Sequence, residues 1–270
     1  MARHSAKRPR LGQNFLAHPA SARKIVELIG LDHNAAVLEI GPGRGALTEL
    51  LLDAAGRVAV VELDVDLAER LRLRYDPTRL LLYQDDILKV DLSRICARLE
   101  SERLIVVGNL PYGISKPVAA KLIRERAQVD RAVLMFQREV ALRLTARPGQ
   151  RSYGPLGVLA GMAFRIQRLF DLPPSCFRPP PKVVSSVTSW TRHGDTDPEQ
   201  QDLDRMRSCL AVCFARRRKT LRNNLRSALG SEPVTDRLLQ DAGIDGTLRA
   251  ESLSPAQFVR LSMEWPRSAR

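Results

Sequence analysis

The hydrophobic residues of this chain fall into short, nearly continuous runs that alternate with longer amphipathic stretches. Runs rich in Val, Leu and Ile predict strands buried on both faces, which are typical of a parallel sheet. Apolar residues spaced three or four positions apart predict helices between the strands. This alternation predicts an α/β fold with a doubly wound, Rossmann-like sheet. The predicted strands are residues 37–40, 58–63, 80–83, 104–107, 132–136, 165–172 and 183–190.

The pattern changes near Thr191, where a polar segment that contains Gly and Pro is typical of a linker. Beyond the linker, apolar residues keep helical spacing to the end of the chain. We therefore predict two domains. Residues 1–192 form a cofactor-binding catalytic domain with a basic N-terminal arm, and residues 193–270 form a small all-helical domain.

The net charge of +13 on 270 residues is unevenly distributed. Residues 1–24 carry a net +6, residues 134–192 carry +7 and residues 201–270 carry +5, whereas residues 25–133 carry −2. A nearly neutral segment between basic ones favours a polyanionic partner that is held around a separate site. The charge pattern therefore favours nucleic acid as the partner.

Other features of the composition narrow the class of protein. The sequence contains no apolar run of the roughly 20 residues that cross a bilayer, and its basic start lacks the apolar stretch of a secretory signal. We therefore expect a cytoplasmic protein with no membrane partner. The four cysteines and four histidines lack the spacing of a metal site, so we expect reduced, buried thiols and no metal. Without a heptad or an extended apolar patch, we expect a monomer.

A glycine-rich turn follows the first predicted strand. Gly41 and Gly43 permit a tight turn into a helix and let a ligand approach the backbone. Glu62 ends the second strand, where a carboxylate can accept ribose hydroxyls, and Asp86 follows the third strand, where it could receive the exocyclic amine of an adenine ring. These residues predict a nucleoside cofactor. The glycine pattern alone is shared by NAD-binding and S-adenosylmethionine-binding folds.

The fourth predicted strand leads into Asn109, Leu110, Pro111 and Tyr112, which favours methyl transfer over hydride transfer. An adenine amine is a poor nucleophile because its lone pair is delocalised into the ring. The Asn109 side-chain oxygen and the Leu110 carbonyl would accept its N–H groups and expose that lone pair. Pro111 biases Leu110 toward an extended backbone, and Tyr112 offers a surface on which a flipped base can stack. The sequence therefore favours S-adenosylmethionine as the cofactor.

At these residues the sequence resembles the KsgA family of small-subunit rRNA adenine dimethyltransferases. The resemblance covers nearly the whole chain in order. It is carried by LGQNFL at 11–16, GPGRGALT at 41–48, VVELD at 60–64, the region of Asp86, NLPYGIS at 109–115, MFQREVALRL at 135–144, SYGPLGVL at 152–159, CFRPPPKV at 176–183 and RRKTLRNNL at 217–225.

The resemblance implies a class I S-adenosylmethionine-dependent methyltransferase fold with a helical C-terminal domain. It implies an enzyme that dimethylates N6 of two adjacent adenines in a hairpin near the 3′ end of 16S rRNA, within the assembling small subunit. Phe177, in the proline-rich loop, would present an exposed ring that stacks on the target adenine opposite Tyr112. The implied cofactor contacts are Gln13, Asn14 and Leu16, which would close over the cofactor, and Gly41, Glu62, Asp86 and Asn109.

A basic cluster near a predicted helix–helix junction is a candidate for contacts with rRNA phosphates. The N-terminal arm, with Arg3, Lys7, Arg8 and Arg10, is a second candidate. The cluster consists of Arg216, Arg217, Arg218, Lys219 and Arg222.

Three other functions remain open from the sequence. A resistance-type methyltransferase of large-subunit rRNA shares the glycine turn and the Asn109–Tyr112 motif, although NLPYGIS, SYGPLGVL and FRPPPKV favour the small-subunit enzyme. A non-catalytic nucleic-acid-binding relative would keep the fold without the reaction. A nicotinamide oxidoreductase rests only on the glycine pattern.

Overall fold

The structure is a computed structural model that describes residues 13–193 and 199–265. The predicted arm residues Arg3, Lys7, Arg8 and Arg10 lie outside the described residues, as does part of the predicted linker.

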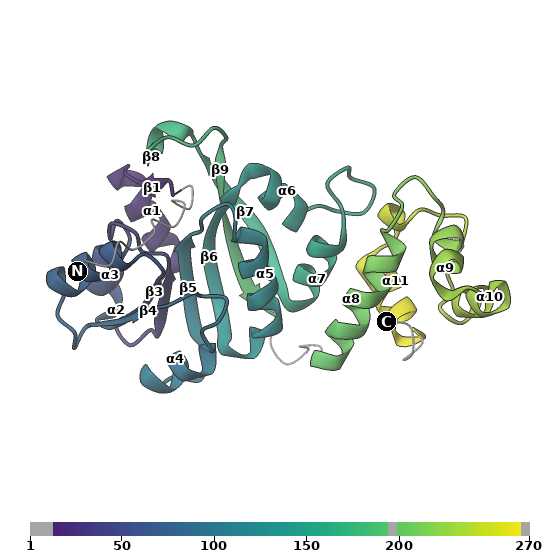
Figure 1. The fold of residues 1–270 in the computed structure, drawn as a ribbon, viewed down its shortest axis with the longest axis horizontal. Helices are drawn as coiled ribbons and strands as arrows, with labels where there is room; N and C mark the ends of the chain where they lie inside the picture. The colour runs from purple at the N-terminus through teal and green to yellow at the C-terminus, as the bar shows by residue number, and fades with distance from the viewer. Residues whose placement is uncertain (1–12, 194–198, 266–270) are drawn as a thin grey trace, which may run out of the picture. The chain divides into compact units, whose positions relative to one another are not determined.

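A seven-stranded sheet in the order β4-β3-β2-β5-β6-β9-β7 forms the centre of the fold (Figure 1). The five neighbouring strands from β4 to β6 are parallel. All seven predicted strands are present, with boundaries that differ by a few residues, and the α/β class is confirmed. The strands are β2 (Val37–Ile40), β3 (Val58–Glu62), β4 (Leu80–Gln84), β5 (Leu104–Asn109), β6 (Val129–Gln137), β7 (Phe164–Leu172) and β9 (Ser185–Arg192).

The central strands form because nearly every side chain in them is apolar and buried. All residues of β2 and β3 are buried, as are the first five of β5. Helices pack against them through apolar faces, and Figure 1 shows α5 lying over the central strands. The helical segments up to β6 are α1 (Pro19–Ile29), α2 (Thr48–Ala55), α3 (Val65–Arg74), α4 (Leu92–Arg98), α5 (Ser115–Arg124) and η1 (Arg126–Gln128).

The strand order reverses at β2, whose two neighbours are β3 and β5. In open α/β sheets, ligands bind beyond the carboxyl ends of the strands at such a switch point. The glycines follow β2, and Glu62 and Asn109 are the last residues of β3 and β5, respectively. The topology therefore brings together three parts of the predicted site that are far apart in the sequence.

A second, very short sheet joins the N-terminal segment to the proline-rich loop. Strand β1 (Phe15–Leu16) pairs antiparallel with β8 (Phe177–Arg178), next to the 3₁₀ turn η2 (Pro174–Cys176). The Ala17 N–H extends the pairing by donating to the Cys176 carbonyl at 2.8 Å. The predicted strands at 165–172 and 183–190 left residues 173–182 as a connecting loop, because two-residue strands leave no readable alternation in a sequence.

The chain divides into two compact units, and the divisions fall inside α6, β7 and β9. One unit contains residues up to 138 together with 168–190, and the other contains residues 139–167 together with those from 191 onward. The second unit contains α6 (Arg138–Leu144, from Glu139), α7 (Pro155–Ala163), α8 (Gln200–Cys213), α9 (Leu221–Leu229), α10 (Glu232–Asp241), η3 (Ala250–Ser252) and α11 (Pro255–Met263).

This division differs from the expected boundary at residue 192. Residues 139–167 were expected in the catalytic domain, but Tyr153 and Val158 share a hydrophobic core with Met206 of α8 and Phe258 of α11. The Tyr153 hydroxyl also donates to the Leu253 carbonyl at 2.9 Å. The segment therefore packs with the C-terminal helices, although it precedes β7 in the sequence.

Three further observations concern the expected class of protein. None of the helices in the described ranges is long and apolar enough to cross a membrane. Over the same residues, no three His, Cys, Asp or Glu side chains are grouped closely enough to hold a metal ion. All four cysteines are free and buried.

Candidate active site

The glycine turn after β2 lies at the switch point of the sheet, and its glycines leave the backbone there without Cβ atoms. Gly41 and Gly43 have φ angles of 65° and 58°, a left-handed conformation that L side chains rarely adopt. The Gly41 N–H donates to the Val61 carbonyl at 2.9 Å, which fixes the turn against β3. A Cβ atom at Gly43 would lie 2.7 Å from the Phe15 ring. Glycine at position 43 is therefore required both by the backbone and by the close approach of a neighbour.

Glu62, at the end of β3, faces this turn. Its side chain is 3% exposed, and its carboxylate accepts the Gly43 N–H at 3.1 Å and the Asp64 N–H at 2.9 Å. Burial raises the pKa of Glu62, while these backbone hydrogen bonds oppose the rise. A carboxylate has about four acceptor positions, so Glu62 can hold the turn and still accept two ribose hydroxyls.

Glu39 is a second buried carboxyl group in the site, and the sequence alone assigned no role to it. It lies in β2 with 2% exposure and accepts the Thr48 hydroxyl at 2.6 Å. Burial raises the pKa of Glu39 to about 7, the Thr48 hydrogen bond opposes the rise, and the nearby Glu62 adds to it. An acid inside an otherwise apolar strand is the sequence signal that could have identified this residue.

Replacement of Glu39 by glutamine is expected to reduce the pH dependence of stability. As the pH rises from the ordinary carboxyl pKa to about 7, the unfolded chain loses the Glu39 proton while the folded chain retains it. The wild type should therefore lose up to about 3 kcal/mol of unfolding free energy over this range, and the variant should not. Urea unfolding of both proteins at about pH 5 and pH 8 measures the difference. Parallel pH profiles would contradict this interpretation.

The tip of β5 carries the predicted reactive motif. The Asn109 side-chain nitrogen donates to the Asn14 carbonyl at 2.7 Å. Among the described residues, the Leu110 carbonyl accepts no backbone hydrogen bond. The half-buried Tyr112 shares a hydrogen bond with the Ser185 hydroxyl at 2.8 Å, and burial raises the pKa of Tyr112. The motif thus presents oxygen acceptors and an aromatic ring whose orientation is fixed by β9.

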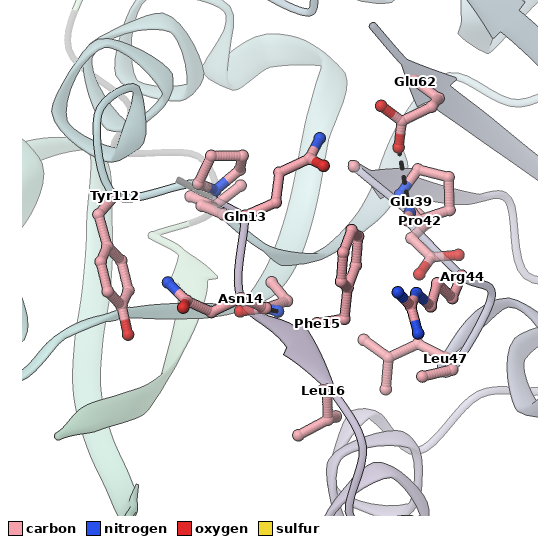
Figure 2. A pocket seen from close by; sticks show the side chains of 16 residues that line it. Gln13, Asn14, Phe15, Leu16, Glu39, Pro42, Arg44, Leu47, Glu62 and Tyr112 are labelled. Atoms are coloured by element: carbon pink, nitrogen blue, oxygen red, sulfur yellow. Dashed lines mark hydrogen bonds between the residues drawn. The ribbon is translucent and has the colours of Figure 1, made fainter. Parts of the chain in front are cut away.

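One cavity joins these parts. It includes the glycine turn, Glu39, Glu62, the tip of β5 and the N-terminal segment (Figure 2). The predicted Gln13, Asn14 and Leu16 line it, as does Phe15, which the sequence reading did not single out. The Arg44 guanidinium lies 4.9 Å from the centre of the Phe15 ring.

Two of the predicted catalytic and cofactor-binding residues, Asp86 and Phe177, do not line this cavity. Asp86 follows β4, where its carboxylate accepts the Leu88 N–H at 3.0 Å and begins a turn. The Asp85 N–H nevertheless donates to the Glu62 carbonyl at 3.1 Å, so the Asp86 turn begins beside the site. The expectation of an exposed ring at Phe177 is wrong: the side chain is 0% exposed and lies in the hydrophobic core, because β8 is paired with β1.

The five residues of the basic cluster lie in the second unit, and they differ in whether their side chains form ion pairs there. Arg217 donates to Glu251 at 2.9 Å and to the Arg151 carbonyl at 2.9 Å, and Arg222 pairs with Asp236. These two guanidinium groups therefore join segments of the helical unit to one another. In the described part of the chain, the other three cluster residues are exposed and form no ion pair. They are Arg216, Arg218 and Lys219.

The chain is similar to known proteins over nearly its whole length. The family model described as "Ribosomal RNA adenine dimethylase" matches residues 4–265. A protein of Acidobacterium capsulatum named "Ribosomal RNA small subunit methyltransferase A" is 46% identical over 248 residues, which cover 92% of this chain and 87% of that protein.

Two crystal structures extend the comparison to the fold. A dimethyladenosine transferase from Plasmodium falciparum is 25% identical with a TM-score of 0.78, and the alignment covers 92% of this chain and 95% of that one. The 23S rRNA methyltransferase ErmE is 26% identical with a TM-score of 0.69, and the alignment covers 93% of this chain and 99% of that one.

Proposed function

Because this chain belongs to the ribosomal RNA adenine dimethylase family, we propose that it methylates N6 of two adjacent adenines in a hairpin near the 3′ end of 16S rRNA during small-subunit assembly. It is a class I S-adenosylmethionine-dependent rRNA adenine dimethyltransferase of the small-subunit type. The position of the two adenines and the assembling particle as the substrate are what we propose beyond this family activity.

The single observation that carries the proposal is the juxtaposition in one cavity of the glycine turn, Glu62 and the Asn109–Tyr112 motif. The bare backbone at Gly43 and the buried acceptors of Glu62 suit a nucleoside. The oxygen acceptors at the tip of β5 suit an amino group. The residues present therefore fit S-adenosylmethionine on one side and an adenine on the other.

S-adenosylmethionine, when bound, supplies an electrophilic methyl group. We propose that the Asn109 side-chain oxygen and the Leu110 carbonyl accept the two N–H groups of the adenine amine. These hydrogen bonds draw electron density onto the nitrogen and favour its pyramidal form. Its lone pair is then no longer delocalised into the ring and faces the methyl group, and the methylated nitrogen loses one N–H proton to water. In the second transfer one of the two oxygens accepts the single N–H that remains. Positioning and electrostatics account for most of the catalysis.

The remaining residues hold the reactants in place. Glu62 would accept the ribose hydroxyls, and Asp86 would receive the adenine amine of the cofactor, a role that requires its turn to approach the cavity. Tyr112 would stack on the target base, with its hydroxyl held by Ser185 at 2.8 Å. Because the Phe177 ring lies in the core, we do not extend the proposed stacking role to it.

The rival functions differ from the proposal in what they methylate or bind. ErmE, which its description connects with 23S rRNA, is 26% identical to this chain. The small-subunit relative from Acidobacterium capsulatum is 46% identical. A non-catalytic nucleic-acid-binding relative would have no need for oxygen acceptors that line the cavity at the tip of β5. An NADH-dependent enzyme would usually need a proton-handling His or Tyr–Lys pair, which the motif at 109–112 does not supply.

The proposed function is tested by incubating the purified protein with labelled S-adenosylmethionine and either immature small or immature large ribosomal subunits. We expect label in small-subunit rRNA, and mass spectrometry should place dimethyladenine at two adjacent positions near its 3′ end. Label confined to large subunits would support the resistance-type function. The absence of any transfer would support the non-catalytic relative.

We further propose that the unpaired part of the basic cluster contacts rRNA phosphates. The double variant Arg218→Ala and Lys219→Ala should weaken binding to small-subunit rRNA and lower the slope of log K against log salt by about one for each lost phosphate contact. Arg237→Ala is a matched control, because Arg237 is an 85% exposed arginine of the same unit that lies 3.7 Å from Asp241. Equal salt slopes for the double variant and the wild type would exclude these contacts.

We also propose that the protein acts in the cytoplasm as a monomer. Sedimentation equilibrium of the purified protein tests the oligomeric state, and the partner in the cell would be the immature small subunit.

A further inference from the structure

Phe15 has no role in the proposed reaction, yet its ring stands inside the active-site cavity. In Figure 2 the ring lies between Asn14 on one side and Glu62 and Arg44 on the other. A Cβ atom built on Gly43 would be 2.7 Å from its Cδ1 atom and 2.9 Å from its Cε1 atom. The ring is therefore in direct contact with the stretch of bare backbone that glycine keeps accessible.

The ring leaves little room for a ligand. The cavity measures about 50 Å³, whereas pockets for small molecules measure about 300–1,000 Å³. The bare backbone of a glycine turn is the surface that a nucleoside cofactor approaches. The ring and a ligand in contact with Gly43 would therefore occupy the same space.

The backbone of Phe15 is held by strand pairing, whereas its side chain is only partly buried. Phe15 and Leu16 pair with Arg178 and Phe177, respectively, and the Ala17 N–H donates to the Cys176 carbonyl at 2.8 Å. Leu16 is anchored in the core, with 6% exposure, whereas Phe15 is only partly buried. Rotation about χ1 would move the ring off Gly43 without breaking the strand pairing.

A cation–π contact holds the ring in the cavity. The Arg44 guanidinium, from the glycine turn itself, lies 4.9 Å from the ring centre. The turn thus supplies both the surface that the ring covers and the charge that attracts it. Opening the site requires this contact to be released.

We propose that Phe15 is a displaceable plug of the cofactor site, whose ring must rotate off Gly43 before S-adenosylmethionine can bind. This inference rests on the cofactor site of the proposed function. Only molecules whose ring has turned away from Gly43 can then bind the cofactor. The apparent affinity is therefore the affinity of this open conformation multiplied by the fraction of molecules that adopt it.

The test is calorimetric titration of S-adenosylhomocysteine into the full-length wild type and into Phe15→Ala. The variant should bind about 3- to 10-fold more tightly, since it has no ring to displace. Arg44→Ala should shift the affinity in the same direction by a smaller factor, because it releases the ring without removing it. Tighter binding by both variants supports the plug.

Phe170→Ala is the matched control. Phe170 is a partly buried aromatic residue of the same unit, with the Lys24 ammonium 4.4 Å from its ring centre, and it does not line the cavity. Its replacement should leave the affinity unchanged. Phe15→Leu, which retains a smaller apolar side chain on the paired strand, guards against misfolding of the alanine variant and should also bind more tightly than the wild type.

Weaker or unchanged binding by a folded Phe15 variant would overturn the plug, because the ring would then be part of the binding surface or irrelevant to it. That outcome leaves the proposed function intact as long as the wild type binds and transfers methyl groups. If S-adenosylhomocysteine bound to neither the wild type nor the variants, both the cofactor site and the plug would be overturned.

Discussion

Replacement of Asn109 by alanine is expected to lower kcat by about 10²- to 10³-fold, the usual effect of removing one preorganised polar group that stabilises a transition state. The affinity for S-adenosylhomocysteine should fall only modestly, because the glycine turn and Glu62 remain. The effect appears in kcat because the side-chain oxygen is proposed to stabilise positive charge that develops on the amine nitrogen during transfer. Single-turnover kinetics with small-subunit rRNA measure the chemical step directly.

Asn109→Asp is the informative companion variant. Aspartate retains an oxygen acceptor for the amine but loses the nitrogen that donates to the Asn14 carbonyl at 2.7 Å. If the alanine variant loses activity because it lacks the oxygen acceptor, the aspartate variant should retain clearly more activity than the alanine variant. If the bond to Asn14 carries it, the two variants should be equally impaired. Activity of the alanine variant within a few-fold of the wild type would contradict the role of Asn109 altogether.

The sequence predicts the sheet well because its strands are buried on both faces. In β2 and β3 every residue is buried, so the hydrophobic runs translate directly into strands. The position of the site was predictable for the same reason, since polar residues at the ends of such runs must lie at one edge of a parallel sheet. The strand order itself cannot be read from the hydrophobic pattern, because every central strand has the same apolar character.

Residues whose environment is set by distant partners were harder to predict. The proline-rich loop suggested an exposed ring at Phe177, but pairing of β8 with β1 places the ring in the core. Its strand partner Leu16, which lies more than 150 residues away in the sequence, shares this core with it. Phe15 itself was overlooked because nothing local distinguishes an aromatic ring in a cavity from one in the core.

Charge clusters show the same limitation. Five basic residues, four of them consecutive, suggested one RNA-binding surface, yet Arg217 and Arg222 form ion pairs with Glu251 and Asp236. Those acids lie in later segments, so the pattern of the cluster alone could not separate its structural members from its exposed ones. The segment around Tyr153 was hard to place for the same reason. The Tyr153 hydroxyl donates to the carbonyl of Leu253, which lies much later in the sequence and belongs to the helical unit.

Replacement of Glu62 by alanine is expected to weaken the binding of S-adenosylhomocysteine by about 10²-fold, since hydrogen bonds to a charged acceptor contribute about 1.5–3 kcal/mol each. The carboxylate is proposed to accept two ribose hydroxyls while it holds the Gly43 N–H at 3.1 Å. Calorimetry at neutral pH measures the loss. Unchanged affinity would contradict the proposed role.

The two contributions of Glu62 can be separated with an analogue of S-adenosylhomocysteine that lacks the ribose 2′-hydroxyl. If Glu62 accepts that hydroxyl, its removal should weaken binding to the wild type but have little further effect in Glu62→Ala, because the two changes delete the same interaction. If Glu62 acts only by holding the glycine turn, the two losses should add. Glu62→Gln, which retains one acceptor oxygen for the Gly43 N–H, should lie between the alanine variant and the wild type. The site would then depend on one carboxylate that both shapes the turn and binds the sugar.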